Sequence, residues 1–187
     1  MSKGLIMDKI WFTSDTHFGS ERTLELSKRP FDNTRQMDAA LILNWNSVVD
    51  NEDTVYHLGD FGNADIISNL NGKRIFVIPG NNDDYDILDR LREDKRVFFI
   101  RNNYILKKSC TGISFDLQLV HEPEFGAGDG NFFLFGHIHQ LQMIKENGLN
   151  VGTDCHRFFP IDTATILFYH NAILNHYDKN VFMGRIG

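Results

Sequence analysis

Seven polar side chains follow short apolar runs of the sequence, and each is of a type that binds metal ions. They are Asp15, His17, Asp60, Asn81, His121, His137 and His139, and they follow the runs IWFTS, VYHLG, IFVIPG, LQLV and FFLFG. Each run is typical of a buried β-strand. Imidazole suits Zn, Mn, Fe or Ni, and carboxylate oxygen suits Mn or Mg. The pattern therefore indicates a site for divalent metal ions at the ends of strands.

Two metal ions held side by side could hydrolyse a phosphate ester at such a site. Metals about 3.5–4 Å apart need a shared oxygen ligand, and Asp60 is the candidate bridge. A water between the metals would lose a proton near neutral pH and become the nucleophile. The metals would also bind phosphate oxygens and neutralise the charge that develops in the transition state.

Each motif alone also has a simpler interpretation. An isolated Asp-x-His is more often structural, and residues 136–139, Gly-His-Ile-His, could be a core pair or a single zinc site. His57 lies within an apolar run, which favours a core histidine or a support for a ligand. The order and number of the motifs favour two metals, because four of the 8 histidines stand at strand ends.

Short strands and helices alternate in the part of the chain that must position these residues. Strands are expected at 9–14, 54–58, 74–79, 132–135 and 149–151. Helices are expected at 35–49, with Thr34 as the cap, at 64–70 and at 84–92. A sheet whose strands all end at one edge would bring the five ligand segments together, and α/β proteins usually place their sites there.

The second half of the chain is richer in strand signals. A hairpin is expected from strands at 104–108 and 113–120, joined around residues 111–112. Asp116 and Gln118 alternate with leucines in its second strand, which predicts one exposed polar face.

Three further segments are less regular. Residues 162–175 are ambiguous and favour a helix capped by Asp162. Residues 126–130 are expected to form an exposed loop beside the site, and the segments 20–29 and 122–131 are expected to shape its pocket.

Composition predicts one domain over residues 1–187. The chain is 42% hydrophobic, enough for a real core, and its net charge of -6 disfavours broad nucleic-acid binding. Two cysteines do not make a disulfide framework, no apolar leader opens the sequence and no stretch approaches a membrane span, so a cytoplasmic protein is expected. The pairs Phe98-Phe99 and Phe158-Phe159 could support a dimer if exposed.

Five motifs occur in a fixed order along about two thirds of the chain. They are Asp15-Thr-His17, Gly59-Asp60-Phe-Gly62, Gly80-Asn81-Asn-Asp83, His121 after an apolar strand, and Gly136-His137-Ile-His139. In this order they resemble the calcineurin-like metallophosphoesterase superfamily. Further segments resemble a small single-domain branch found in bacteria and phages: Arg29-Pro30-Phe31, Trp45-Asn46-Ser47 and Asn150-Val-Gly-Thr-Asp154.

The resemblance implies an α/β fold with four αββα layers, two packed mixed β-sheets flanked by helices. It implies a hydrolase of phosphate monoesters or diesters that uses a binuclear centre of two divalent metal ions, Mn, Fe, Zn or Ni. Asp15, His17 and His139 would bind the first metal, and Asn81, His121 and His137 the second. Asp60 would bridge them, and Asp60 and Asn82 are the positions implied in catalysis.

Asn82 departs from the resemblance, because the family usually has histidine there. That histidine is thought to contact the phosphate and to protonate the leaving group. An asparagine amide can donate a hydrogen bond but cannot deliver a proton near pH 7, and general acid help is typically worth about 10²–10⁴-fold. Asp83 would support the histidine in relatives and loses that partner here. Ser20 is a smaller departure, since the branch often has histidine there.

Three consequences of Asn82 stay open. The substrate could have a good leaving group, another group such as His156 or a metal-bound water could supply the proton, or most catalysis could be lost. The last case would leave a metal-binding scaffold or a weakly active relative. The complete ligand set favours an enzyme acting on a small phosphate ester. Arg22, Arg29 and Arg157 could clamp a phosphate or a nucleotide, although such arginines are more often solvated surface residues. A nucleotide or nucleic-acid substrate is possible but not indicated by the charge.

Overall fold

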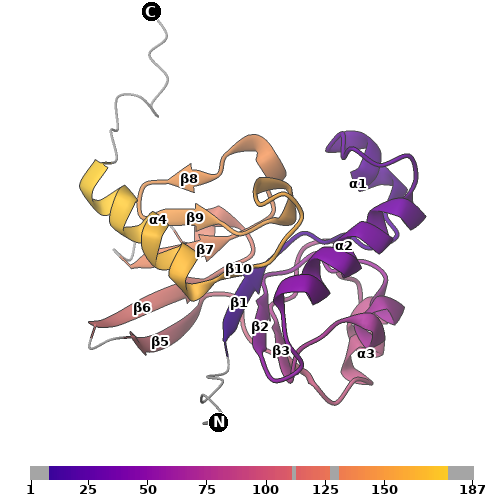
Figure 1. Ribbon diagram of the computed structural model, residues 1–187, viewed down its shortest axis with the longest axis horizontal. Helices are drawn as coiled ribbons and strands as arrows, with labels where there is room; N and C mark the ends of the chain where they lie inside the picture. Colours follow the sequence, from indigo (N-terminus) through magenta and orange to yellow (C-terminus); the bar gives the residue numbers. More distant parts are fainter. Residues whose placement is uncertain (1–8, 111–112, 127–130, 177–187) are drawn as a thin grey trace, which may run out of the picture.

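The computed structural model describes residues 9–110, 113–126 and 131–176, which form two mixed five-stranded sheets packed against each other (Figure 1). The first sheet has the order β10-β1-β2-β3-β4, with bounds Ile161–Asp162, Ile10–Thr13, Thr54–His57, Arg74–Val77 and Val97–Phe99. The second has the order β5-β6-β7-β9-β8, with bounds Tyr104–Cys110, Ile113–Leu119, Phe132–Phe135, Gly148–Asn150 and Ile144–Lys145. The mixed two-sheet α/β fold is confirmed.

In both sheets the strands that lead to the predicted ligands run parallel to one another. Strands β1, β2, β3 and β4 run parallel, with β10 antiparallel at the edge. Strands β6, β7 and β9 also run parallel, with β5 and β8 antiparallel at the two edges. The carboxyl ends of the parallel strands therefore meet at one side of the molecule.

Four α-helices and four short 3₁₀ helices complete the described fold. The α-helices are α1 Glu21–Leu26, α2 Thr34–Val48, α3 Tyr85–Arg92 and α4 Thr163–His176. The 3₁₀ helices are η1 Ala64–Asn69, η2 Pro123–Phe125, η3 His139–Leu141 and η4 Thr153–Cys155. No helix in the described ranges is both long and apolar enough to cross a membrane.

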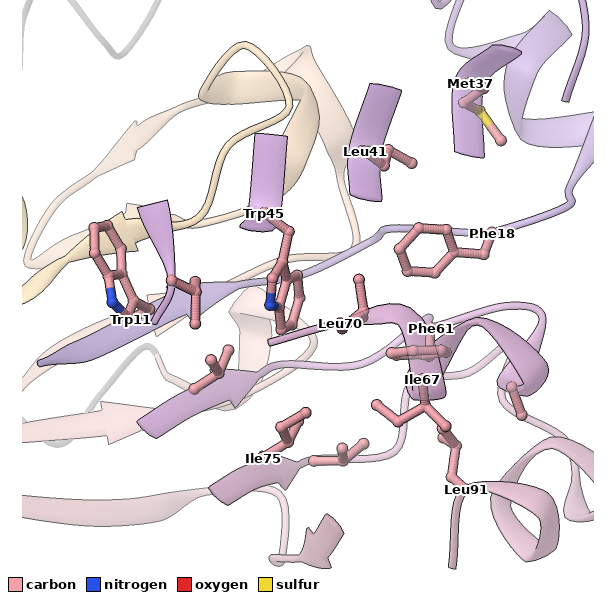
Figure 2. Close-up of a cluster of buried hydrophobic side chains, with 14 residues drawn as sticks. Trp11, Phe18, Met37, Leu41, Trp45, Phe61, Ile67, Leu70, Ile75 and Leu91 are labelled. Carbon is pink, nitrogen blue, oxygen red and sulfur yellow. The ribbon is translucent and has the colours of Figure 1, made fainter. Parts of the chain in front are cut away.

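The neighbouring strands β1 and β2 of the first sheet are buried on both faces, as expected from their continuous apolar runs. On one face, Trp11, Val55 and Ile75 pack against α2, η1 and α3 (Figure 2). On the other, Phe12 and Tyr56 pack against the second sheet and α4. Adjacent residues of a strand point to opposite faces, so β1, β2 and β3 each contribute to both cores.

Most elements agree with the sequence-based expectations, and the differences have local causes. Helix α2 is capped by Asn33, not Thr34, because the Asn33 Oδ1 accepts a hydrogen bond from the Gln36 backbone at 2.9 Å. Helix α1 was not expected, and its cap is Ser20, whose hydroxyl accepts from the Thr23 backbone. The helix expected at 162–175 is present as α4, and the hairpin is present as β5 and β6.

The exposed polar face expected for β6 is wrong at Gln118. This side chain is buried, and its Nε2 donates to Asn103 Oδ1 at 2.5 Å and to the Phe125 carbonyl at 3.2 Å. Strand β6 lies between β5 and β7, and the partners of Gln118 in η2 and at Asn103 satisfy its amide nitrogen inside the protein. The hairpin turn at 111–112 and residues 127–130 of the glycine-rich loop lie outside the described residues.

Candidate metal centre

The seven predicted ligands lie directly after five parallel strands of the two sheets. Asp15 and His17 follow β1, Asp60 follows β2, Asn81 follows β3, His121 follows β6, and His137 and His139 follow β7. The sequence pattern had suggested the edge of one sheet, and the structure shows that the ligands follow strands of both sheets. Backbone bridges from Ser14 to Gly152 and from Phe18 to Gly62 tie the loops together.

Five of these seven residues adopt left-handed backbone conformations. Their φ angles are 55° for Asp15, 48° for His17, 59° for Asp60, 71° for His137 and 49° for His139. Non-glycine residues rarely adopt such angles, and the strain persists only where surrounding contacts enforce it. Here the amides of Asp15 and His17 donate to the carbonyls of Gly59 and Asp60, at 2.9 and 3.0 Å. Strain clustered in this way is typical of a functional site.

Two glycines allow the loops to approach one another. A Cβ on Gly59, whose φ is 99°, would lie 2.6 Å from His121 Nδ1. A Cβ on Gly136 would overlap Ser14 Oγ and Asp15 Oδ2. Each glycine therefore leaves room for a different group of ligands.

The first ligand group consists of Asp15, His17 and His139, whose donor atoms lie within 4.8 Å of one another. The rings of His17 and His139 stack with centroids 5.2 Å apart. His17 Nε2 is buried and has no hydrogen-bond partner among the described residues. A buried polar atom without a partner is costly, so a cation beside His17 fits this group.

The second group consists of Asp60, His121 and His137, joined by Asn81. The Asn81 Oδ1 lies 2.9 Å from His121 Nε2 and 2.8 Å from His137 Nδ1. His121 Nε2 lies 3.5 Å from Asp60 Oδ2. These nitrogen and oxygen atoms converge from four loops, and their types suit a divalent cation.

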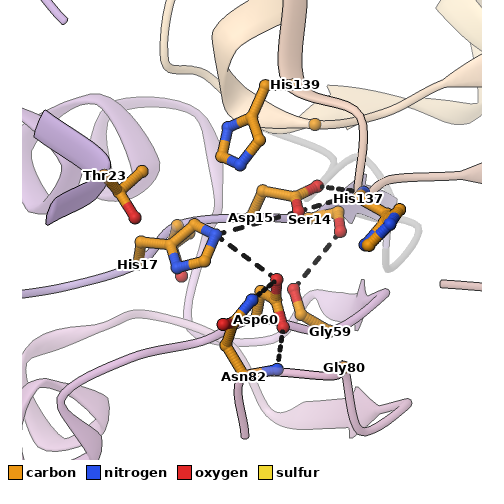
Figure 3. A network of polar contacts seen from close by, with 12 residues as sticks. Ser14, Asp15, His17, Thr23, Gly59, Asp60, Gly80, Asn82, His137 and His139 are labelled. Carbon is orange, nitrogen blue, oxygen red and sulfur yellow. Dashed lines mark hydrogen bonds and ion pairs between the residues drawn. The ribbon is translucent and has the colours of Figure 1, made fainter. Parts of the chain in front are cut away.

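Asp60 lies between the two groups, and Figure 3 shows its contact with His17 of the first group. Its Oδ2 lies 3.4 Å from His17 Nε2 in the first group and 3.5 Å from His121 Nε2 in the second. One carboxylate oxygen therefore faces both sets of ligands, which is the position a bridging ligand needs.

Burial and charge shift the pKa values of these groups in the metal-free protein. Burial lowers the pKa of His17 to about 4, although the Asp60 charge opposes it. Burial also disfavours the charged form of His121, but the carboxylates of Asp60 and Asp15 outweigh it and raise its pKa to about 9. For Asp60, contacts with His121 and Asn82 overcome burial and hold its pKa below the ordinary value. Burial raises the pKa of Asp15.

A buried ion pair behind His139 was missed by sequence reasoning. His139 Nδ1 lies 2.7 Å from Asp154 Oδ2, and the Asp154 carboxylate accepts two hydrogen bonds from Arg29, at 2.9 and 2.8 Å. Arg29 also donates to the carbonyls of Asp15 and Thr16. The surface position expected for Arg29 is wrong, because the side chain is buried and donates its hydrogen bonds to groups inside the protein. The signal was present in the segments Arg29-Pro30-Phe31 and Asn150–Asp154.

Asn82 and Asp83 hold the loop around Asp60. The Asn82 backbone and Nδ2 donate to the two Asp60 oxygens at 2.8 and 2.7 Å. Asp83 is buried, and its carboxylate accepts from the amides of Asp60, Phe61 and Gly80 at 2.8 Å each. Asp83 therefore has a structural task of its own despite the absence of a histidine at position 82.

Other candidate residues fall outside the centre. His57 is buried, lies 3.0 Å from the Thr16 hydroxyl and packs against Phe61, as expected for a core histidine. His156 points its Nε2 to the Asn150 carbonyl at 2.7 Å and does not line the cleft above the ligands. Arg157 is exposed and also lies away from this cleft, whereas Arg22 lines it.

Four of the seven ligands line a cleft of about 620 Å³. His17, Asn81, Asn82, His137 and His139 line it, so a bound molecule would reach the metal centre directly. One wall comes from α1 and its cap, and the other from η3 and the residue before it. The volume suits a small molecule.

Comparisons with known proteins agree with this geometry. Residues 9–172 match the model of the calcineurin-like phosphoesterase superfamily domain. The chain is 30% identical to the uncharacterized protein MJ1445 of Methanocaldococcus jannaschii over 172 residues, 86% of this chain and 90% of that protein. It is 41% identical to the Gene 66 protein of Mycobacterium phage L5 over 58 residues, 31% of this chain and 28% of that protein. A protein of unknown function from Aquifex aeolicus, AQ665, has the same fold, with a TM-score of 0.68, 20% identity and coverage of 87% and 100% of the two chains.

Proposed function

Since the chain belongs to the calcineurin-like phosphoesterase superfamily, it is a metal-dependent hydrolase of phosphate esters, and we propose that it works through a binuclear metal centre. The observation that carries the proposal is the position of Asp60 Oδ2, within 3.5 Å of a histidine nitrogen of each ligand group. A carboxylate in that position can be shared by two ions.

We propose the ligand assignment that the family resemblance implies. Asp15, His17 and His139 would hold the first ion, Asn81, His121 and His137 would hold the second, and Asp60 would bridge the two. The mixture of imidazole, carboxylate and amide donors suits Mn, Fe, Zn or Ni, and we propose manganese as the first metal to test. When bound, the two ions supply a hydroxide nucleophile and neutralise the charge of the phosphate.

The protein's own residues supply position and geometry. The Asp154 carboxylate faces Nδ1 of His139, and the Leu58 carbonyl faces Nδ1 of His121. In each histidine the other ring nitrogen is left for the metal. The Asn82 amide lies at the cleft beside Asp60 and can donate a hydrogen bond to a phosphate oxygen. It delivers no proton, so the leaving group must depart with little help from this position.

The decisive experiment compares the protein with its Asp60→Ala variant. Purified protein is incubated with Mn²⁺ and a nitrophenyl phosphate monoester or diester, and bound metal is counted in the same sample. Loss of the bridge should lower turnover at least about 10³-fold and reduce the metal content. Asp65→Ala, which changes an exposed aspartate of η1, is the matched control and should retain both. Equal activity in all three proteins would contradict the proposal.

A second function stays open because of Asn82. A metal-binding scaffold on the same fold would bind two ions, hydrolyse neither ester class and retain a partner protein. Asn82→His separates this case from an enzyme that only lacks an acid. In an enzyme, the histidine should raise turnover of alkyl esters more than of nitrophenyl esters, since only poor leaving groups need a proton. No difference between the classes would show that proton delivery is not the missing element.

The partners we propose are small phosphate esters in the cytoplasm. The net charge of -6 argues against a long nucleic acid as the main ligand. Cys155 is a free thiol, which suits a reducing compartment. Phe158 packs against Phe31 within the protein, so Phe98, which is 45% exposed, is the better candidate for a dimer contact.

A further inference from the structure

The cleft above the metal ligands is larger than a phosphate group needs. Its volume of about 620 Å³ lies in the range that holds a whole small organic molecule, of roughly 300–1,000 Å³. Four of the ligands line one part of the cleft and other residues line the rest, so that remaining space is available to the organic part of an ester. The residues of its two walls therefore bear on which esters fit.

Each wall carries a leucine with most of its surface exposed. Leu26, in the last turn of α1, is 70% exposed, and Leu141, at the end of η3, is 86% exposed. A single exposed leucine is ordinary on a protein surface. These two differ because both line the cleft that holds the metal ligands, and the half-buried Ile87 and Ile138 line it with them.

Helix α1 also presents a cation to the same cleft. Arg22 lies four residues before Leu26, so both side chains share one face of the helix. An ester bound there would have its anionic phosphate near the metals and Arg22. Its organic group would lie against leucine and isoleucine, where burial of apolar surface is favourable.

We propose that Leu26 and Leu141 form an apolar subsite for the organic group of the substrate. The preferred substrates are then phosphate esters that carry an apolar group of aryl size or larger beside the scissile phosphate. Esters of small or strongly polar alcohols would leave the two leucines exposed to water. This subsite deepens the proposed function and rests on it.

A pair of phosphonates tests the subsite without any turnover. Phenylphosphonate and methylphosphonate share the anionic head group and cannot be hydrolysed, so they differ only in the group offered to the leucines. The Mn²⁺-loaded protein should bind phenylphosphonate at least tenfold more tightly in calorimetric titration. Leu26→Ala and Leu141→Ala should each reduce that preference several-fold and leave methylphosphonate binding unchanged.

Two other exposed leucines provide matched controls. Leu43 of α2 and Leu174 of α4 are 69% and 63% exposed and lie outside the cleft. Leu43→Ala and Leu174→Ala should keep the full preference for phenylphosphonate. Equal binding of the two phosphonates, or an equal loss for both in the cleft variants, would overturn the subsite.

Turnover of two diesters separates this result from the proposed function. Phenyl p-nitrophenyl phosphate and methyl p-nitrophenyl phosphate release the same leaving group. The cleft variants should raise KM for the phenyl ester with little change in kcat, because the contact holds ground and transition state alike. Hydrolysis of both esters with no effect of either variant would reject the subsite and keep the enzyme. Tight phenylphosphonate binding without hydrolysis of either ester would reject the enzyme and keep the subsite.

Discussion

In the first ligand group, His139 is held by a buried charged pair, whereas in the second group His121 is held by a backbone carbonyl. His139 Nδ1 faces Asp154, which is bound in turn by Arg29. His121 Nδ1 donates to the Leu58 carbonyl at 2.7 Å. Both arrangements fix the ring and leave one nitrogen for a metal. A side-chain support can be removed by one substitution and a backbone support cannot, so the two groups should differ in how mutations affect them.

Asp154→Ala should produce the largest difference between the two groups. The substitution removes the support of His139 and leaves the Arg29 charge buried without its partner, which typically costs about 3–5 kcal/mol of stability. Removal of such a support typically lowers metal affinity about 10–100-fold. We expect this loss for one of two Mn²⁺ ions in calorimetric titration, with the other retained.

The milder Asp154→Asn variant keeps the result interpretable if the alanine variant folds poorly. Asparagine preserves the shape and one acceptor, so stability should recover more than affinity. Asp94→Ala serves as the control, because it breaks an aspartate–arginine pair with Arg96 away from the metal centre. If Asp94→Ala lowered Mn²⁺ affinity as much as Asp154→Asn, the special role of Asp154 would be lost.

Two glycine substitutions should each disturb a different ligand group through steric overlap. Alanine at Gly136 would push against Asp15 of the first group, and alanine at Gly59 would push against His121 of the second. Overpacking typically costs about 1–3 kcal/mol, and the left-handed φ of Gly59 adds a further strain of order 1–3 kcal/mol. We expect lower melting temperatures for both, with Gly59→Ala the worse, and weaker binding of a different Mn²⁺ ion in each.

Gly72→Ala is the control for the glycine pair. Gly72 has a φ of 130°, but its Cβ would meet nothing closer than 3.5 Å and lies away from the ligands. It should lose stability through backbone strain while binding both ions normally. Normal metal binding by Gly59→Ala would show that the close approach of Gly59 to His121 is not needed.

The ligand loops could be predicted from sequence better than their supports. Asp15, Asp60 and His137 each follow an apolar run, and the parallel direction of those strands brings the loops to one side. Such a pattern is local, because strand and loop are adjacent in the chain. It suggested one sheet edge, and only the structure shows the edges of two sheets.

The supports depend on contacts between distant segments, which sequence spacing does not show. Arg29 and Asp154 are far apart in the chain, and an isolated arginine in a loop is ordinarily at the surface. Gln118 looked like a surface residue for the same reason, since η2 and Asn103 cover it only in the folded chain. Helix α1 was hidden because six residues give too little periodicity to detect.

The smallest difference between the groups concerns the pH dependence of the metal-free protein. Burial lowers the pKa of His17 to about 4, so the folded protein binds fewer protons there than the unfolded chain between pH 4 and 6.5. Stability from this residue is complete above pH 6.5 and is lost as the pH falls towards 4. His121 has the opposite sign. With its pKa raised to about 9, its stability is complete below pH 6.5 and is lost as the pH rises through 9.

Urea unfolding of the chelator-treated protein between pH 4 and 10 measures both changes in the free energy of unfolding. The loss at acid pH and the loss at alkaline pH should each be roughly 1–3 kcal/mol. His17→Asn should reduce the loss of stability at acid pH. Part of that loss should remain, because the pKa of His57 is also lowered, to about 3.

His121→Asn should reduce the loss of stability at alkaline pH, which His139 partly maintains because Asp154 raises its pKa. His176→Asn, at an exposed position, should change the stability at neither end of the pH range. If His121→Asn left the loss of stability at alkaline pH unchanged, the Asp60 carboxylate would not be holding a proton on His121.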